Sequence, residues 1–257
     1  MGGVYLGTSG WDYPEWVGRF YPKRGVSDEL RYYAGFFPIV EVNSTFYRLP
    51  PVSVAQSWAR RTPKGFRFAL KFPQTITHDR KLIGAEREIE EFARFLRPLQ
   101  EANKLSAALV QLPPSLPFEP ATVRHFYESL PDGIPVAVEP REPTWLRADS
   151  KALLREFGYA YVIVDEPLLP IDLDVTAPFS YIRWHGHGTS IWYDYTYSAE
   201  ELRAWAPRVE QLRERSEAVF GFFNNHFRGD AAVNARSLSD LLNLPPPPWA
   251  AAGKLIP

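Results

Sequence analysis

Short apolar runs alternate along this chain with segments of helical periodicity. Eight of the runs have the length and composition of buried β-strands. Eight further segments can be helical; in one of them Ser198 and Glu201 have the spacing of a capping box, and Ser27 is a suitable N-cap for another. Strands and helices that alternate without a break in composition predict one α/β domain with a parallel sheet. The expected strands are residues 4–7, 39–43, 66–72, 105–112, 135–138, 159–164, 179–184 and 218–223.

Polar residues stand at the ends of these apolar runs. A strand buried on both faces has no structural use for a charge at its tip, whereas the carboxyl ends of parallel barrel strands converge on one site. We therefore expect a single-domain TIM-type (β/α)8 barrel with a pocket on its C-terminal face. The tips carry Glu41, Asn43, Lys71, Gln111, Glu139, Arg141, Asp165, Arg183, His185, Asn224, Asn225 and His226.

Residues two positions before several tips are small or aliphatic. Because residues two apart on a strand share a face, these residues would line the lumen beneath the polar tips. Trp184, which alternates with Arg183 and His185, should instead face the helices. The pairs that share a face are Ala69 with Lys71, Leu109 with Gln111, and Ala137 with Glu139.

Length and composition fit one such barrel. The chain has 257 residues, and a barrel of this kind needs about 250. Its hydrophobic content of 45% can fill a large core, which excludes disorder over most of the length. We expect the barrel to span residues 1–244, and the proline-rich residues 245–257 to be a tail of the same domain.

Charge and cysteine content exclude several kinds of site. A net charge of −1 lacks the basic surface of a general nucleic-acid-binding protein, although a local basic pocket is compatible with it. The absence of cysteine excludes disulfides, thiolate metal sites and a cysteine nucleophile. The start of the chain has neither a basic nor an apolar signal region, and no stretch is long enough to span a bilayer. We therefore expect a cytoplasmic protein that does not bind membranes.

Seven segments between residues 7 and 236 resemble the YecE-like family, the domain of unknown function 72. The segments occur in the order of the family's motifs and cover most of the chain. The resemblance implies a TIM-barrel fold and places motifs at the same strand tips, but it implies no established reaction. The segments are GTSGWDYPEWVGRFYP, EVNSTFYRLP, FALKFPQTITHDRKL, QLPPSL, AVEPREPTW, YIRWHG and FFNNHFRGDAAVNAR.

Glu41, Glu139 and Asp165 are the predicted catalytic carboxylates, and His185 is the predicted acid/base. Carboxylate and imidazole groups at barrel strand ends are also typical ligands of Mg²⁺, Mn²⁺ or Zn²⁺. A divalent metal bound by these four residues is therefore one option. The alternative is a metal-free pocket in which each carboxylate pairs with a neighbouring cation. No spaced ligand motif such as H-E-x-x-H is present to favour the metal.

Lys71, Arg141 and Arg183 end three different strands, and buried cations need partners. An anionic ligand, a phosphate or a carboxylate, would supply one. A closed salt-bridge network would explain the same residues. Further predicted binding residues are polar or aromatic groups at the strand ends and in the adjoining loops, where Trp192 and Tyr193 are expected to form a lid wall. They are Thr8, Trp11, Asn43, Tyr47, His78, Gln111, Asn224 and Asn225.

These residues predict an enzyme that acts on a small anionic compound, phosphorylated or related to a sugar or nucleotide. The chemistry would be acid/base or metal-assisted, in a hydrolase, isomerase or lyase. The alternative is a non-catalytic module that binds a ligand or a partner in the barrel pocket. A retaining glycosidase of the usual barrel type is disfavoured, because the fourth strand ends in Gln111 rather than in a carboxylic acid.

Overall fold

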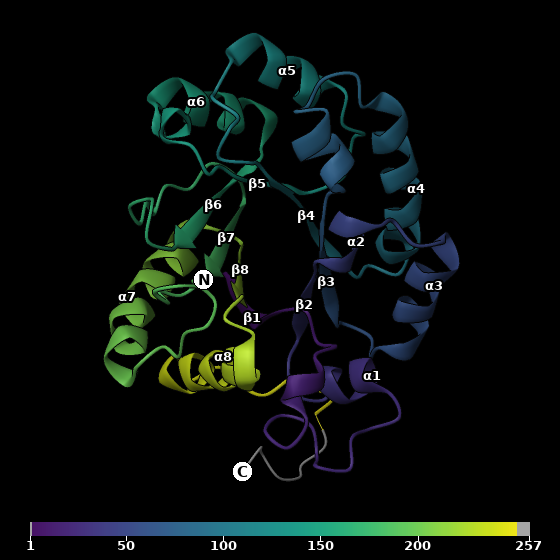
Figure 1. The fold of residues 1–257 in the computed structure, drawn as a ribbon, viewed down its shortest axis with the longest axis vertical. Coiled ribbons are helices and arrows are strands. Elements are labelled where there is room, and N and C mark those ends of the chain that lie inside the picture. The colour runs from purple at the N-terminus through teal and green to yellow at the C-terminus, as the bar shows by residue number, and fades with distance from the viewer. Residues whose placement is uncertain (1, 251–257) are drawn as a thin grey trace.

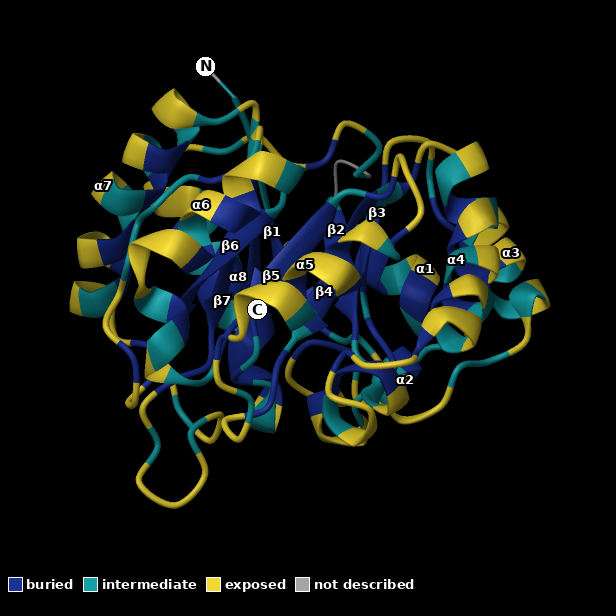
Figure 2. Cartoon of the chain, turned by 90° about the horizontal axis from the view of Figure 1, so that it is seen from above, coloured by how far each residue is buried: buried dark blue, intermediate teal, exposed yellow. Residues whose placement is uncertain are grey.

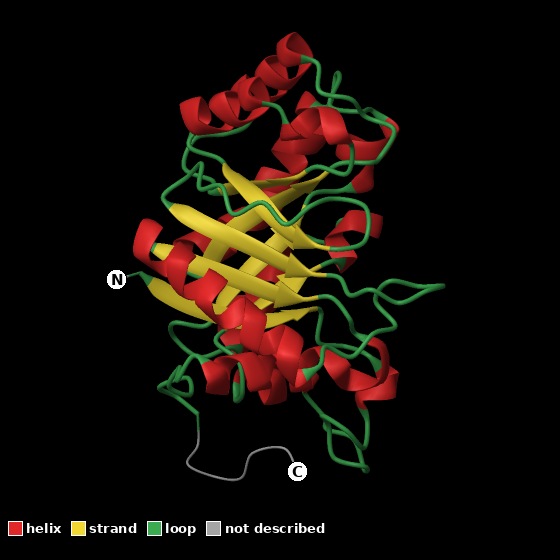
Figure 3. Cartoon of the chain, turned by 90° about the vertical axis from the view of Figure 1, so that its left-hand side faces the viewer, coloured by secondary structure: helices red, strands yellow, loops and turns green. Residues whose placement is uncertain are grey.

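The computed structural model of the protein describes residues 2–250. Parallel strands in this part of the chain form a closed barrel in sequence order, which β1 closes by pairing with β8 (Figures 1 and 3). The predicted TIM-type barrel is therefore confirmed. The strands are β1 Gly3–Ser9, β2 Ile39–Val42, β3 Arg67–Lys71, β4 Leu105–Gln111, β5 Val136–Glu139, β6 Ala160–Asp165, β7 Phe179–Trp184 and β8 Ala218–Phe223.

Helices surround the barrel and cover its outer face (Figure 1). The long ones expose one side and bury the other against the strands, as Figure 2 shows by the change from yellow to dark blue. Short helical turns lie at residues 14–16, 75–79, 143–146 and 227–229. The main helices are α1 Glu29–Ala34, α2 Ser44–Tyr47, α3 Val52–Arg61, α4 Glu86–Glu101, α5 Pro120–Glu128, α6 Ala148–Phe157, α7 Ala199–Arg215 and α8 Asp230–Leu241.

Two helix starts test the predicted caps. The capping box at Ser198 is present, since its side chain accepts from the Glu201 N–H and the Glu201 carboxylate accepts from the Ser198 N–H. The predicted N-cap at Ser27 is wrong by one residue. Asp28 caps α1 instead, by accepting from the Arg31 N–H over 2.9 Å, and an ionised carboxylate is a strong acceptor at a helix N-terminus.

The connection between β6 and β7 differs from the expected alternation of eight strands and eight helices. Residues 166–178 contain no helix. Pro167, Pro170 and Pro178 lie in this stretch, and proline removes a backbone donor and disfavours helix at the preceding residue. The segment therefore crosses from one strand to the next as an extended loop.

Two hydrophobic cores hold the barrel together. The outer core lies between strands and helices and contains Trp184, which stacks on Phe223 at 4.4 Å between ring centroids, as its predicted orientation requires. The inner core fills the lumen and contains Ala69, Leu109 and Ala137, as predicted. The lumen is thus closed by side chains, and the polar tips stand at its top.

The start of the predicted proline-rich tail packs on the barrel. Trp249 packs against the outer core, and its Nε1 donates to the Ala34 carbonyl over 2.7 Å. The rest of that predicted tail, residues 251–257, lies outside the described residues. Among residues 2–250, no helix has both the length and the apolar character that crossing a membrane requires.

Candidate active site

A cavity of about 780 Å³ opens at the carboxyl ends of the strands. These are the arrowhead ends in Figure 3, from which long loops extend. The cavity has the size of a small-molecule site, and a pocket on this face confirms the expectation from the strand tips. Eight of the predicted site residues line it: Asn43, Tyr47, Lys71, Gln111, Arg141, Arg183, His185 and Asn224.

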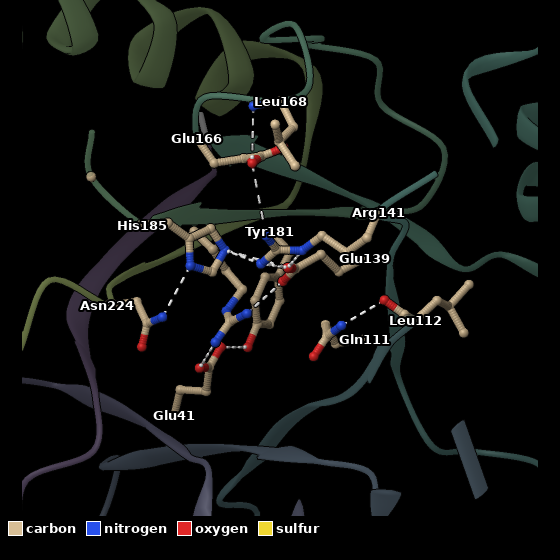
Figure 4. Close-up of polar contacts among 12 residues, drawn as sticks. Glu41, Gln111, Leu112, Glu139, Arg141, Glu166, Leu168, Tyr181, His185 and Asn224 are labelled. Atoms are coloured by element: carbon tan, nitrogen blue, oxygen red, sulfur yellow. Dashed lines mark hydrogen bonds and ion pairs between the residues drawn. The ribbon is translucent and has the colours of Figure 1, made fainter. Parts of the chain in front are cut away.

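A network of buried ion pairs lies beneath the cavity (Figure 4). Arg183 donates from Nη1 to Glu139 Oε2 over 2.6 Å and from Nη2 to Glu41 Oε1 over 2.7 Å. The Tyr181 hydroxyl donates to Glu41 Oε2, also over 2.7 Å. All four side chains are buried. One guanidinium therefore joins carboxylates from two strands, with further hydrogen bonds that a buried ion pair needs.

The network continues through Arg141 towards the end of β6. Arg141 Nε donates to Glu139 Oε1 over 2.6 Å, and Arg141 Nη1 lies 3.9 Å from Glu166 Oε2. The same Glu166 oxygen accepts from the Leu168 N–H over 3.1 Å. Carboxylates and guanidinium groups thus alternate from Glu41 to Glu166. Such alternation keeps like charges apart in a region of low dielectric constant.

The network holds Glu139 and Arg183 in their charged forms. Burial alone would raise the pKa of Glu139, but the charges of Arg141 and Arg183 outweigh it and hold that pKa well below its ordinary value. Burial acts to lower the pKa of Arg183, whereas Glu139 and Glu41 raise it above its ordinary value. Glu139 and Arg183 therefore form a fixed electrostatic floor for the cavity.

His185 joins this floor as a neutral imidazole. Burial, reinforced by the charge of Arg141, lowers the pKa of His185 to about 3. Arg141 donates to its Nε2 over 2.8 Å, so Nε2 accepts and the ring proton lies on Nδ1. Asn224 Nδ2 lies 3.0 Å from Nδ1, and with the ring proton on Nδ1 the Asn224 amide has to be turned so that its oxygen accepts this proton. His185 therefore fixes Arg141 and is no acid at neutral pH.

Among the described residues that line the cavity, Lys71 is the cation that this pairing leaves free. Its Nζ lies 3.8 Å from the centroid of the Phe46 ring, and within residues 2–250 no carboxylate oxygen lies within 4.0 Å of it. Burial and the charge of Arg183 lower the pKa of Lys71 to about 7, against the opposing effect of Glu139 and Glu41. An amine that is partly neutral at neutral pH therefore faces the cavity.

Aromatic rings from three loops, those after β1, β7 and β8, form one wall of the cavity. The His226 ring stacks between Tyr13, at 4.7 Å between centroids, and Tyr193, at 5.5 Å. The loop that carries Trp192 and Tyr193 folds back at Gly188, whose N–H donates to the Trp192 carbonyl over 3.1 Å. A Cβ at this glycine would lie 2.1 Å from the Ile191 carbonyl oxygen, so only glycine fits the turn. The predicted lid residues line the cavity.

The rim of the cavity is apolar and open to solvent. Tyr47 is 74% exposed and Leu168 65%, and Ile191 and Tyr193 are also exposed. Exposed apolar side chains that gather at one place mark a binding surface more often than scattered ones do. A charged floor under an apolar rim suits a ligand with one polar end and a less polar body.

Asp165, predicted as a catalytic residue, points away from the cavity. Along β6 it follows Tyr161 and Ile163 on the face that packs against helices. Trp205 Nε1 donates to Asp165 Oδ2 over 2.8 Å, and His187 Nε2 lies 2.8 Å from Oδ1. The prediction therefore needs correction: the alternation along the strand places this carboxylate outside the barrel, where it holds α7 and a loop.

Thr8 and Asn225, predicted as binding residues, face outward for the same reason. The Thr8 hydroxyl donates to the Gly10 carbonyl over 2.6 Å, and the Thr8 N–H donates to the Tyr33 hydroxyl over 2.9 Å. Asn225 Nδ2 donates to the Tyr195 carbonyl and to Asn234 Oδ1, each over 2.8 Å. Both residues therefore fasten loops to the barrel and do not line the cavity.

Trp11 and His78 also lie outside the cavity. Trp11 packs edge-on against Trp58 at 5.7 Å and lines a neighbouring hollow of about 620 Å³. The His78 ring packs edge-on against Phe46 at 4.9 Å, and its Nδ1 lies 2.8 Å from the Thr77 hydroxyl. A position in the loop after a strand therefore did not suffice to predict that these side chains line the cavity.

The carboxylates do not converge on a common point as metal ligands do. Glu41 and Glu139 are bound to guanidinium groups, His185 accepts from Arg141, and Asp165 lies outside the barrel. Across residues 2–250 there is no group of three or more His, Asp or Glu side chains that could hold a metal ion. The arrangement corresponds to the ion-paired alternative rather than to a metal centre at these four residues.

Tyr181 and Glu166 belong to the network but were not among the predicted residues. Alternation along the strands is the signal for both: Tyr181 lies two positions before Arg183, and Glu166 lies two positions after the lumen-facing Val164. Tyr13 and Phe46 also line the cavity. Both lie after the strands, where no periodicity marks the direction of a side chain.

Relatives of known sequence or structure resemble the chain over most of its length. The UPF0759 protein YunF of Bacillus subtilis is 28% identical over 94% of this chain and 95% of its own. The UPF0759 protein YecE of Escherichia coli O157:H7 is 29% identical over 82% of each chain. A crystal structure of the DUF72 family protein TM1631 from Thermotoga maritima superposes with a TM-score of 0.85, at 35% identity, over 94% of this chain and 99% of that one.

The family itself follows from a match along almost the whole chain. The family model described as "Protein of unknown function DUF72" matches residues 5–252. This range contains β2 to β8, most of β1, and the network beneath the cavity. The earlier resemblance is confirmed, and the chain belongs to the DUF72 family.

Proposed function

We propose that this protein is an enzyme that acts on a small compound with an anionic group, by acid/base chemistry at Lys71. The observation that carries the proposal is the position of the Lys71 amine, which lines the cavity and has no carboxylate partner within 4.0 Å among the described residues. The cations beside it are fixed by Glu41 and Glu139. A ligand at this amine therefore meets an unpaired charge.

The hydrogen-bonding groups left over at the cavity favour an anion. The oxygens of Glu41 and Glu139 already accept from arginine or tyrosine. The Lys71 ammonium, by contrast, offers donors and no acceptor. The side-chain amides of Asn43 and Asn224 also line the cavity, but each carries both a donor and an acceptor, so the surplus of donors comes from Lys71. Carboxylate or phosphate oxygens would match this surplus of donors.

The pKa of Lys71 suits proton transfer at neutral pH. A general base works best when its pKa lies near the working pH, because it must both take up and release the proton. Burial and Arg183 bring the pKa of Lys71 to about 7. We assign the proton transfer to this residue. The sequence suggested Glu139, Arg183 and His185 as reacting or clamping groups. In this proposal they instead form the floor of the cavity and hold it in place.

Binding and turnover of small anions by the full chain test the proposal. Calorimetric titration with oxalate and inorganic phosphate should show binding that Lys71→Met abolishes and that Lys71→Arg, which keeps the charge, retains. Lys64 is exposed, so Lys64→Met serves as the matched control. Proton NMR of mixed small carboxylates and phosphates should then show conversion by the wild type but not by Lys71→Arg, since its guanidinium does not give up a proton.

The outcomes separate the proposal from the alternative of a non-catalytic module. Binding that depends on Lys71, without conversion of any compound, would favour a ligand-binding protein. Anion binding that Lys71→Met leaves unchanged would overturn the assignment of the site. A net charge of −1 does not favour nucleic acid as the general partner.

A further inference from the structure

We infer that Lys71 acts covalently, and that its amine forms a Schiff base with an aldehyde or ketone that also carries an anionic group. A 2-oxo acid is the simplest compound of this class. The inference rests on the proposed function, because it uses the same cavity and the same charged end of the ligand. It adds a bond to the ligand that acid/base chemistry alone does not require.

The surroundings of Lys71 differ from those of the other lysines in the described part of the chain. Lys104 is buried, but its Nζ donates to the Ala59 and Thr62 carbonyls, at 2.8 and 2.7 Å. Lys151 is paired with Asp172 and lies 3.6 Å from Asp174. Of the lysines in residues 2–250, only Lys71 lines the cavity. The remaining described lysines are exposed: Lys23, Lys64 and Lys81.

An amine attacks a carbonyl carbon only when it is neutral. Two effects favour the neutral form of Lys71: removal from water, and neighbouring positive charge. Burial and Arg183 together lower the pKa of Lys71 to about 7, so a large fraction of the amine is free at neutral pH. The charged and titratable groups that act on it are Arg183 and Arg141, which lower this pKa, Glu139 and Glu41, which raise it, and His78, whose pKa Lys71 in turn lowers.

The Phe46 ring gives the reaction a suitable wall. Lys71 Nζ lies 3.8 Å from the ring centroid. An aromatic face attracts a cation, and the protonated imine is a cation at the same nitrogen. The ring covers one side of the amine, and the amine also lines the cavity from which a carbonyl compound would approach. Arg141, at the cavity wall and only partly buried, stands where an anionic end of the ligand would be held.

The chemical step balances without a further reactant. The neutral Lys71 nitrogen forms a bond to the carbonyl carbon, and the carbonyl oxygen becomes a hydroxyl group. The carbon–oxygen bond then breaks, and the oxygen leaves as water with both hydrogens of the amine. The resulting imine takes one proton from solvent at the open mouth of the cavity. Nothing is oxidised or reduced.

Reductive trapping on the full chain tests this inference. The protein is incubated with pyruvate and, separately, with glyoxylate, each with sodium cyanoborohydride, and the mass of the intact chain and of its peptides is measured. We expect one adduct per chain, on the Lys71 peptide, with a rate that rises through pH 7 as the amine loses its proton. Lys71→Arg should lower labelling by more than about tenfold, because its guanidinium stays protonated. Lys64→Met should label as the wild type does.

Oxalate separates failure of this inference from failure of the proposed function. Oxalate is an anion without an aldehyde or ketone group, so it can bind at the site but cannot form the adduct. Binding of oxalate that depends on Lys71, with no adduct from either carbonyl probe, would overturn the Schiff base and leave the proposed function standing. Labelling confined to Lys23, Lys64 and Lys81 would also overturn the Schiff base. If oxalate does not bind and neither carbonyl probe labels the chain, both the Schiff base and the proposed function are overturned.

Discussion

Arg183 and Glu41 form an ion pair of 2.7 Å across the top of the lumen, although β8 and β1 separate their strands in the barrel. The pair therefore ties together parts of the wall that share no backbone hydrogen bonds. Glu139, which Arg183 also contacts, extends the tie to β5. One buried guanidinium thus connects three of the eight strands. We expect its removal to lower the free energy of unfolding of the whole barrel.

Replacement of Arg183 by methionine should destabilise the protein strongly. The change leaves Glu41 without its cation and removes one of two cations from Glu139, in a place that water does not reach. Removing one partner of a buried ion pair costs about 3–5 kcal/mol. Urea denaturation should show this loss. Arg94→Met, which breaks the exposed pair with Glu90, is the control and should cost less than about 1 kcal/mol; an equal loss in both variants would contradict the role of the network.

Replacement of Tyr181 by phenylalanine should have a smaller effect of the same kind. The change keeps the ring in the lumen but removes the 2.7 Å hydrogen bond to Glu41. Hydrogen bonds to charged groups contribute about 1.5–3 kcal/mol. Tyr127→Phe is a matched control, since the Tyr127 hydroxyl is buried and has no hydrogen-bond partner among residues 2–250. The first variant should unfold at clearly lower urea concentration, and the second at the wild-type concentration or above it.

The fold could be predicted from sequence because eight apolar runs and their spacing admit few arrangements other than a barrel. The site was harder to predict because it depends on which face of each strand a side chain occupies. Glu41, Lys71 and Glu139 lie on the lumen face, each with a small or aliphatic residue two positions earlier, so alternation along the strand predicts their direction. Asp165 lies one position out of phase with the lumen-facing Val164, so its polarity at a strand tip was misleading.

The loops were the least predictable part of the site. Trp11 follows a strand, as Arg141 does, yet it packs on Trp58 outside the cavity. The direction of a loop side chain depends on tertiary contacts that have no period in the sequence, such as the fold-back at Gly188. Tyr181 was missed for a different reason: an aromatic residue inside an apolar run looks like core, and only its partner Glu41 shows that its hydroxyl is used.

The buried His185 should make the protein sensitive to mild acid. Burial lowers its pKa to about 3 from an ordinary 6.5. Between these values the unfolded chain binds a proton that the folded protein does not, so stability falls as the pH falls. The slope from this group is at most about 1.4 kcal/mol per pH unit. Denaturation between pH 6.5 and 5 should show it, above the range in which Glu139 takes up a proton.

His185→Gln removes the titrating ring, and the acid slope of stability should become shallower in this variant. His125→Gln, which removes an imidazole that is 72% exposed, should keep the wild-type slope. If His185→Gln followed the wild-type curve over the same range, the acid sensitivity would have to come from other groups, and the neutral form of His185 in the folded protein would be in doubt.

Lys71 should produce a pH dependence of the same sign as that of His185, but at higher pH. Its pKa is lowered from 10.5 to about 7, so between these values the unfolded chain again binds the extra proton, and stability rises with pH. The contribution reaches at most about 1.4 kcal/mol per pH unit. Lys71→Met removes it. Wild type and variant should therefore differ most below pH 7, where the variant no longer buries an unpaired charge and is the more stable protein.

Denaturation of wild type, Lys71→Met and Lys64→Met from pH 6.5 to 9 measures this difference. The curves of the wild type and of Lys64→Met should rise together, while that of Lys71→Met stays flatter and starts higher. A variant that is less stable than the wild type at every pH would mean that Lys71 has a stabilising partner and is charged throughout. In that case the amine would not be free at neutral pH, and both its proton transfer and its attack on a carbonyl would lose their physical basis.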